Sequence, residues 1–239
     1  MTAMRFMILH KTNAHWEAGA IPSPELIGRV GALIGELAKS GRLESGEGLR
    51  PSAEGVRLRF HGGETTVTPG PFRGEDEAPA GFTILRVGSR DAAVQWATRL
   101  AAILGEGELD VRPVTEAWDI GMMPKPEALT TRRYMVLRKE TGTEPTSEQR
   151  AAVARLVEEA RGTGSYLGGE NLRPSARGRR YKNSKNGVTV TDGPFAESKE
   201  MIAGYVLVRV HSLDEAGKLA ERYLGVVEAE EVDVREVEG

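Results

Sequence analysis

GEGLRPSA at residues 46–53 recurs as GENLRPSA at residues 169–176, and this recurrence decides how the chain is organised. The same shift of 123 residues carries TVTPGPF at residues 66–72 onto TVTDGPF at residues 189–195. Between residues 46 and 99, 25 of 54 positions are identical at this one register. Unrelated sequences would share only a few residues at a fixed register, so the chain contains two copies of one domain.

The opening segments of the two copies match at a different shift. FMIL at residues 6–9 corresponds to YMVL at residues 134–137, so the first copy carries five extra residues, in or near residues 14–20. Residues 117–131 belong to neither copy, and their prolines indicate a linker. The sequence therefore predicts two domains, 1–116 and 132–239, each of an ordinary domain size.

The composition excludes several classes of protein. The formal net charge is −3 and there is no cysteine, so neither a nucleic-acid partner nor any disulfide, thiolate or cysteine metal site is expected. We interpret the basic run at residues 177–185 as a solvated hairpin. No apolar run approaches the roughly 18–20 residues that cross a bilayer, and no signal segment is evident. We expect a cytoplasmic protein with no membrane partner.

Each copy predicts a strand, a helix, a hairpin, a further strand, a second helix and a last strand. In the first copy Ser23 is typical of a helix start, and residues 56–60 and 65–68 alternate as the arms of a hairpin. In the second copy Asn186-Gly187 is a strong hairpin turn signal. This order predicts an α+β fold of the ferredoxin-like type with an added hairpin, in which helices cover one face of an antiparallel sheet.

The segment TDGPFAESKE at residues 191–200, followed by Ala203-Gly204-Tyr205, resembles the DGPF motif of the YCII-related family. GGENLRP at residues 168–174 and Asp-Glu-Ala at residues 214–216 support the resemblance. It implies a dimeric α+β barrel in which two ferredoxin-like antiparallel sheets face each other. Fusion of two copies would make this arrangement an intramolecular pseudo-dimer, and a homodimer of fused chains is left open.

The resemblance also implies clefts between sheet and loops. A few relatives are hydrolases or dehydrochlorinases of small ring compounds and are thought to use a His–Asp pair on the first helix. The corresponding residues here, 28–39 and 149–162, include no histidine. The first copy also has Pro69 where the second has Asp192, so its motif is degenerate.

Asp192 and His10 are the candidate catalytic residues. Asp192 precedes Gly-Pro at the end of a predicted strand, where its carboxylate could act as a general base or cap the backbone of its own turn. His10 ends the first strand, and an imidazole there could serve as an acid–base group or be a passive, partly exposed side chain.

Four residues are candidates for binding a ligand. Arg50 and Arg173 are identical in the two copies and could hold a carboxylate or phosphate, or instead brace neighbouring glutamates or the interface. His15 and Trp16 occupy the five-residue insertion, where an aromatic side chain could form a lid over a ring or a hydrophobic plug over the helix. The histidines show no ligand pattern, so no metal site and no cofactor are expected.

These residues are compatible with three functions. The first is an enzyme that acts on a small aromatic or carbonyl compound by acid–base chemistry in an intersheet cleft. The second is a non-catalytic protein that binds a small molecule in the same cleft, which the missing helical His–Asp pair favours. The third is a regulatory protein-interaction module, which predicts an exposed apolar edge or patch.

Overall fold

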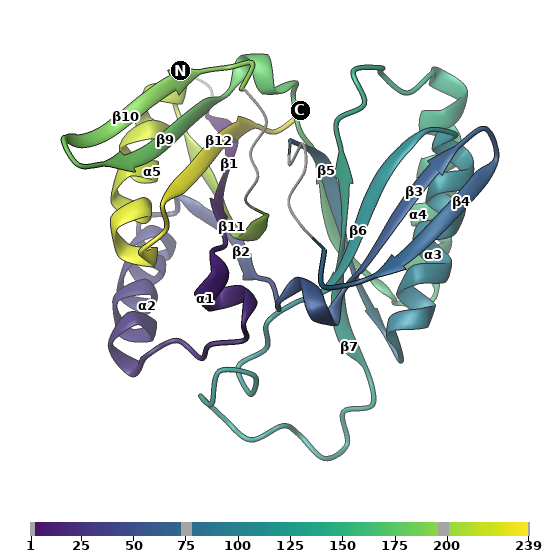
Figure 1. The fold of residues 1–239 in the computed structure, drawn as a ribbon, viewed down its shortest axis with the longest axis horizontal. Coiled ribbons are helices and arrows are strands. Elements are labelled where there is room, and N and C mark those ends of the chain that lie inside the picture. Colours follow the sequence, from purple (N-terminus) through teal and green to yellow (C-terminus); the bar gives the residue numbers. More distant parts are fainter. Residues whose placement is uncertain (1–2, 73–77, 196–200, 239) are drawn as a thin grey trace. The chain divides into compact units, whose positions relative to one another are not determined.

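The computed structural model describes residues 3–72, 78–195 and 201–238. Within them the chain forms two six-stranded antiparallel sheets with helices packed against each (Figure 1). The expected α+β class is therefore confirmed. None of the helices in these residues is long and apolar enough to cross a membrane.

One sheet has the strand order β10-β9-β12-β1-β11-β2. Its strands are β1 Met4–Lys11, β2 Leu43–Gly48, β9 Arg179–Ser184, β10 Gly187–Asp192, β11 Ile202–Val210 and β12 Glu231–Glu236. Helices α2 (Pro24–Lys39) and α5 (Leu213–Val227) lie side by side on one face of this sheet (Figure 1). The short helix α1 (Ala14–Glu17) falls in the five-residue insertion of the first copy.

The other sheet has the strand order β4-β3-β6-β7-β5-β8. Its strands are β3 Val56–His61, β4 Glu64–Pro69, β5 Pro79–Val87, β6 Gly107–Pro113, β7 Arg132–Lys139 and β8 Tyr166–Asn171. Helices α3 (Arg90–Leu104) and α4 (Ser147–Gly162) pack against each other and against this sheet. Two short 3-10 turns, Ser52–Glu54 and Ser175–Arg177, occupy equivalent positions in the two copies.

The two compact units of the chain each combine parts of both sequence copies. Unit 1 contains the first copy up to Gly48 and the second copy from Leu172 onward, whereas unit 2 contains Leu49–Phe72 and Ala78–Asn171. Each sheet therefore takes its first strand, first helix and second strand from one copy and its remaining elements from the other. We call this arrangement the segment exchange.

Helix α2 begins where the sequence predicts, because the Ser23 hydroxyl accepts a hydrogen bond from the Leu26 amide. At the start of α4, Thr146 and Gln149 form a reciprocal capping box. At Ser212 only half of a capping box forms. The Ser212 hydroxyl accepts from the Glu215 amide, while the Glu215 carboxylate accepts from the His211 amide instead of the Ser212 amide.

The sequence failed to predict one strand in each copy. Strands β2 and β8 are the edge strands LESGEG and YLGGEN, whose glycines lower β propensity. The structure explains one of these glycines: a Cβ atom at Gly169 would lie 2.6 Å from the carbonyl oxygen of Phe82 on the neighbouring strand. These strands form through pairing with β11 and β5, so local sequence alone gives little signal.

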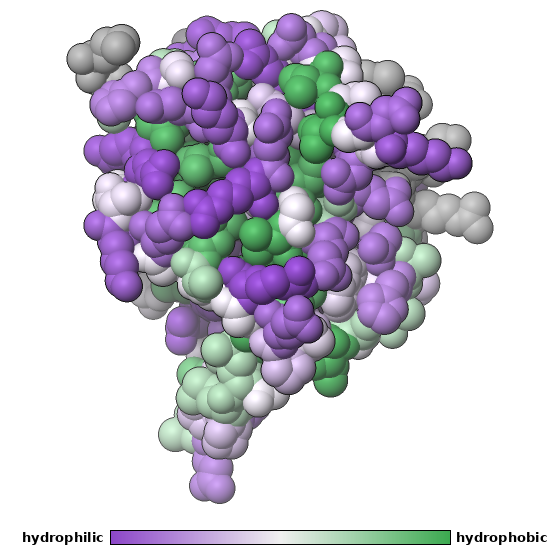
Figure 2. All heavy atoms as spheres, turned by 90° about the vertical axis from the view of Figure 1, so that its left-hand side faces the viewer, coloured by the Kyte–Doolittle hydropathy of each residue, from purple (hydrophilic) through white to green (hydrophobic). Residues whose placement is uncertain are grey.

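Strand alternation gives each sheet an apolar face beneath its helices and an opposite face that carries charged side chains together with buried apolar ones such as Met7 and Leu9. On β3, Val56, Leu58 and Phe60 join the core beneath the helices, while Arg57 points to the opposite face and is nevertheless only 2% exposed. The core of unit 1 is built in the same way from β1, β11 and β12 against α2 and α5. The outer surface of those two helices is mostly hydrophilic (Figure 2).

Candidate functional site

The Gly-Pro-Phe part of the motif packs against the 3-10 turn of its own copy. A Cβ atom at Gly70 or Gly193 would lie 1.8 Å from the carbonyl oxygen of Ser52 or Ser175, so only glycine allows this approach. Beyond the proline, Phe72 lies over the Arg57 guanidinium at 4.3 Å, and Phe195 over that of Arg180 at 4.7 Å. Residues 196–200 of the motif lie outside the described residues.

The arginine beneath each phenylalanine belongs to a buried charged cluster. In unit 2, Arg57 makes a bidentate pair with Asp110 at 2.7 and 2.8 Å and approaches Glu108 at 3.1 Å. Lys139 pairs with Glu108 and lies 3.8 Å from Asp110. We call Arg57, Glu108, Asp110 and Lys139 the charged cluster of unit 2.

Unit 1 repeats this arrangement with equivalent residues. Arg180 pairs with Asp233 at 2.7 and 3.0 Å and lies 3.1 Å from Glu231, while Lys11 lies 3.1 Å from Asp233. The side chains of Lys11 and Asp233 are 0% and 2% exposed. In each charged cluster the lysine comes from one sequence copy and the other three residues from the other copy, because the clusters bridge the exchanged strands.

The cations of these clusters lower the pKa of one carboxylate in each unit, Asp233 in unit 1 and Glu108 in unit 2. Burial by itself would raise the pKa of Asp233, but Lys11 and Arg180 outweigh it, and the net pKa lies below the ordinary value. The pKa of Glu108 is lowered in the same way, with burial opposed by Lys139, Arg57 and Arg59. Carboxylates with lowered pKa values that already bind cations are poor general bases at neutral pH.

These shifts predict how stability depends on pH. Because the folded pKa of Asp233 is lower than its unfolded value of 3.8, its stabilisation is fully present above that value and is lost as the pH falls through the folded pKa. We expect urea unfolding midpoints to fall steeply below about pH 4. The unfolding midpoint of Asp233→Asn should be lower than that of the unsubstituted protein at pH 7, and it should fall by less between pH 5 and pH 3. Equal losses in both proteins would exclude Asp233 as the source.

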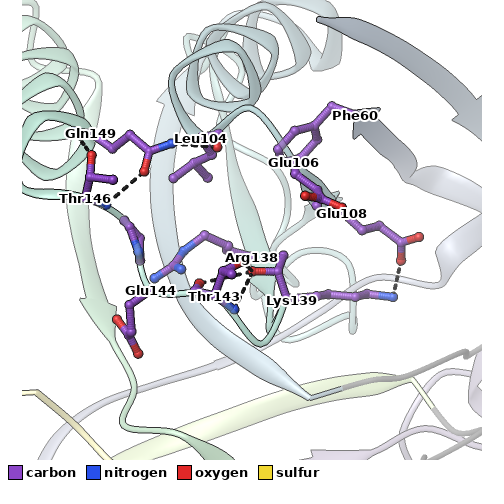
Figure 3. A pocket seen from close by; sticks show the side chains of 13 residues that line it. Phe60, Leu104, Glu106, Glu108, Arg138, Lys139, Thr143, Glu144, Thr146 and Gln149 are labelled. Atoms are coloured by element: carbon purple, nitrogen blue, oxygen red, sulfur yellow. Dashed lines mark hydrogen bonds and ion pairs between the residues drawn. The ribbon is translucent and has the colours of Figure 1, made fainter. Parts of the chain in front are cut away.

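A pocket of about 250 Å³ opens beside the charged cluster of unit 2 (Figure 3). It lies between the ends of β3, β6 and β7 and the loop that leads into α4. It is lined by Phe60, Leu104, Glu106, Gly107, Glu108, Arg138, Lys139, Thr141, Thr143, Glu144, Pro145, Thr146 and Gln149. The loop that closes it is the one that carries the five-residue insertion in the first copy.

The cations of this pocket are engaged with protein acceptors. Arg138 donates to the Ala80 carbonyl and to the Asn171 side chain, both at 3.0 Å, while Lys139 pairs with Glu108. The carboxylates of Glu106 and Glu144 are 67% and 65% exposed at the rim. In this pocket, carboxylate and hydroxyl groups of the protein are therefore more available to a ligand than its cationic groups are.

The structure places Asp192 and His10 in unit 1 but does not bring them together. Strands β9 and β12 separate β10, which carries Asp192, from β1, which carries His10. Three strand spacings correspond to about 14 Å. Asp192 is exposed and accepts a hydrogen bond from Arg179 at 2.8 Å.

His10 lies on the helix side of the sheet, against α5. Its Nδ1 atom and the Tyr223 hydroxyl are 2.9 Å apart, and the two rings meet edge to face. Burial raises the pKa of Tyr223, so this phenol stays protonated at all ordinary pH values. Contact with a buried phenol therefore gives His10 a packing partner on α5.

Of the four predicted ligand-binding residues, Arg50 belongs to unit 2 and the other three to unit 1. Arg50 of unit 2 makes an ion pair with Glu54, and its carbonyl oxygen accepts from Arg112. Arg173 of unit 1 offers its carbonyl oxygen to Arg235 in the same way. His15 and Trp16 stack edge to face on α1, where His15 is exposed and Trp16 is half-buried. No group of three or more histidine, aspartate or glutamate side chains in residues 3–72, 78–195 and 201–238 could hold a metal ion.

Sequence reasoning missed the charged clusters and the pocket, although a signal for the clusters was present. Asp110 and Arg57 recur at the 123-residue shift as Asp233 and Arg180. Charged residues that both copies share at alternating strand positions indicate that these side chains have charged partners on one face of the sheet. The pocket left no such signal, because its lining comes from three separate segments, around residues 60, 104–108 and 138–149.

The comparisons with known proteins agree with the duplication. A family model described as the YCII-related domain matches residues 4–117 and, a second time, residues 132–238. The two matches coincide with the two sequence copies and together cover most of the chain. No curated protein matches it.

Proposed function

Starting from a chain that belongs to the YCII-related domain family, we propose that it is a non-catalytic protein that binds a small molecule with an amine group in the pocket of unit 2. The observation that carries this proposal is the lining of the pocket. Both cations of the lining are engaged with protein acceptors, Lys139 with the lining carboxylate Glu108. The other two carboxylates of the lining, Glu106 and Glu144, are mostly exposed.

The lining also favours a particular size and shape of ligand. A volume of about 250 Å³ is just below the usual range of ligand pockets, so the ligand should be small. Phe60 and Leu104 offer an apolar wall, and the hydroxyls of Thr141 and Thr143 offer hydrogen bonds. Glu106 and Glu144 approach His61 and Arg150 only at 3.3 and 3.5 Å, and an amine could replace these exposed contacts.

Binding without catalysis is favoured because the expected acid–base residues do not converge on the pocket. Asp192 and His10, the residues expected to perform proton transfer, belong to unit 1, and about three strand spacings separate them there. In unit 2 the residue equivalent to His10 is Arg138, whose guanidinium does not act as a base.

The ferredoxin-like interpretation of each unit is part of this proposal. Without the outer hairpin, unit 1 has the order β12-β1-β11-β2. This order corresponds to the fourth, first, third and second strands of a β-α-β-β-α-β unit. Unit 2 has the same order, β6-β7-β5-β8.

Calorimetric titration with ethanolamine, 1,4-diaminobutane and succinate tests the proposed function. We expect both amines to bind at low ionic strength and succinate not to bind. Glu106→Gln/Glu144→Gln should weaken amine binding by about tenfold, since two charged hydrogen-bond acceptors are lost. Glu158→Gln, on the exposed face of α4, serves as the matched control. Binding of succinate alone, or equal amine binding by the double variant, would overturn the proposal.

A further inference from the structure

We propose that the segment exchange is selected by the unequal distribution of two glutamates around two cross-strand arginine pairs. In unit 1, Arg5 on β1 lies directly opposite Arg209 on β11. In unit 2, Arg133 on β7 lies directly opposite Arg86 on β5. Like charges at directly opposite positions destabilise a sheet unless a carboxylate lies between them.

Each arginine pair has its own carboxylate, but the two carboxylates come from different places. In unit 1, Glu44 on β2 receives Arg5 Nε at 2.8 Å and Arg209 Nε at 2.7 Å. These contacts lower the pKa of Glu44 against the opposing effect of burial.

In unit 2, Glu116, which follows β6, takes the corresponding place. It receives Arg133 through two hydrogen bonds of 2.9 and 2.8 Å. Burial opposes the ionisation of Glu116, but Arg133, and to a smaller extent Arg86, lower its pKa. One glutamate therefore serves each arginine pair.

Without the exchange this balance would be lost. The first copy alone would combine Arg5 and Arg86 with both Glu44 and Glu116. The second copy alone would combine Arg133 and Arg209 with neither, because its residues at those positions are Leu167 and Gly239. Glu238 corresponds to Thr115 and not to Glu116. The exchanged arrangement is the one that gives every arginine pair a carboxylate.

The contact between His10 and Tyr223 is an independent observation that favours the same arrangement. His10 belongs to the first copy and Tyr223 to the second, and their polar atoms are 2.9 Å apart. The residue of the first copy equivalent to Tyr223 is Leu100. In an unexchanged chain His10 would face a leucine, and Tyr223 would face Arg138.

The ion pair between Arg29 and Glu228 also joins the two copies, and its equivalents Ala152 and Gly105 could not form it, so it favours the exchange as well. Two further sets of ion pairs between the copies do not distinguish the two arrangements. The charged clusters contain the same residue types in both units, and Arg222–Glu36 in unit 1 is equivalent to Arg99–Glu159 in unit 2. These pairs would form equally well with or without the exchange. Selection must therefore come from positions at which the copies differ, such as Glu44 and Leu167.

A three-cysteine reporter can measure the choice, since the chain has no cysteine of its own. Met4 lies opposite Val210, and its equivalent Arg132 lies opposite Val87. With Met4→Cys, Val210→Cys and Val87→Cys, the cysteine at position 4 can join position 210 only if the segments are exchanged, or position 87 only if they are not. The reduced protein is unfolded, refolded and oxidised, and peptide mapping gives the ratio of the two disulfides.

We expect the 4–210 disulfide to predominate in the reporter. Adding Glu44→Leu/Leu167→Glu should lower the ratio by about tenfold, because the ion pairs of one partly buried glutamate with two arginines are lost from one arrangement and gained in the other. Glu44→Gln alone should lower the ratio of the two disulfides by a smaller factor. This single variant provides the test if the double variant does not fold. A predominant 4–87 disulfide, or a ratio that none of these substitutions changes, would overturn the proposal.

Discussion

Asp233→Ala is expected to lower the free energy of unfolding by about 3–5 kcal/mol, the usual effect of removing one partner from a buried ion pair. The substitution removes the carboxylate that lies 3.1 Å from Lys11, whose side chain is fully buried. It also removes the acceptor of the two hydrogen bonds that Arg180 donates to Asp233. Urea unfolding monitored by circular dichroism measures the loss. It should exceed by several-fold the loss caused by Asp192→Ala.

Asp192→Ala is the matched control because it removes the same side chain from an exposed ion pair. The Asp192 side chain is 80% exposed beside Arg179, and such pairs stabilise a protein by about 0–1 kcal/mol. If Asp233→Ala leaves too little folded protein, Asp233→Asn removes the charge and keeps the shape. Adding Lys11→Met to Asp233→Ala should recover part of the loss, since the buried cation is then absent as well. Equal effects of Asp233→Ala and Asp192→Ala would contradict the role of the charged cluster.

Gly193→Ala is expected to destabilise the protein by about 3 kcal/mol or more, at the upper end of the cost of overpacking. The added Cβ atom would lie 1.8 Å from the carbonyl oxygen and 2.7 Å from the carbonyl carbon of Ser175. Both atoms belong to the backbone, so a side-chain rotation cannot relieve the clash. The 3-10 turn or the Gly-Pro-Phe segment must move, and either movement disturbs the position of Phe195 over Arg180.

Gly225→Ala in α5 is the control for Gly193→Ala. A Cβ atom at Gly225 meets nothing within 4 Å, and alanine in a helix interior is favoured over glycine by about 0.5–1 kcal/mol. The two substitutions add the same methyl group, and we expect opposite signs in thermal unfolding. A small effect of Gly193→Ala would show that the motif glycine is not required by packing.

Packing thus explains the glycine and the phenylalanine of the motif, but it does not explain the aspartate that only the second copy has, Asp192. Gly193 is required by its approach to Ser175, and Phe195 covers the arginine of the charged cluster. Asp192 pairs with Arg179 at an exposed sheet edge, and the first copy forms the same hairpin with Pro69 in its place. In the described part of the motif, the Gly-Pro-Phe segment therefore joins a turn to a buried arginine.

The sequence by itself determined the duplication, the α+β class, the helix start at Ser23 and the two hairpins. These features depend on contacts between residues close in sequence, such as a hydroxyl and an amide three residues apart, so local residues specify them. The strands β2 and β8 escaped prediction because their formation depends on distant strands and not on their own propensity.

Only the tertiary structure decided which copy supplies which strand to each sheet, and with it the charged clusters, the pocket and the separation of Asp192 from His10. The physical reason lies in the repeat itself. Lys11 meets Asp233, but the first copy contains an equivalent aspartate, Asp110, so the residue types alone allow either pairing. The choice depends on long-range contacts at the few positions where the copies differ, and their combined energies appear only when the whole chain is folded.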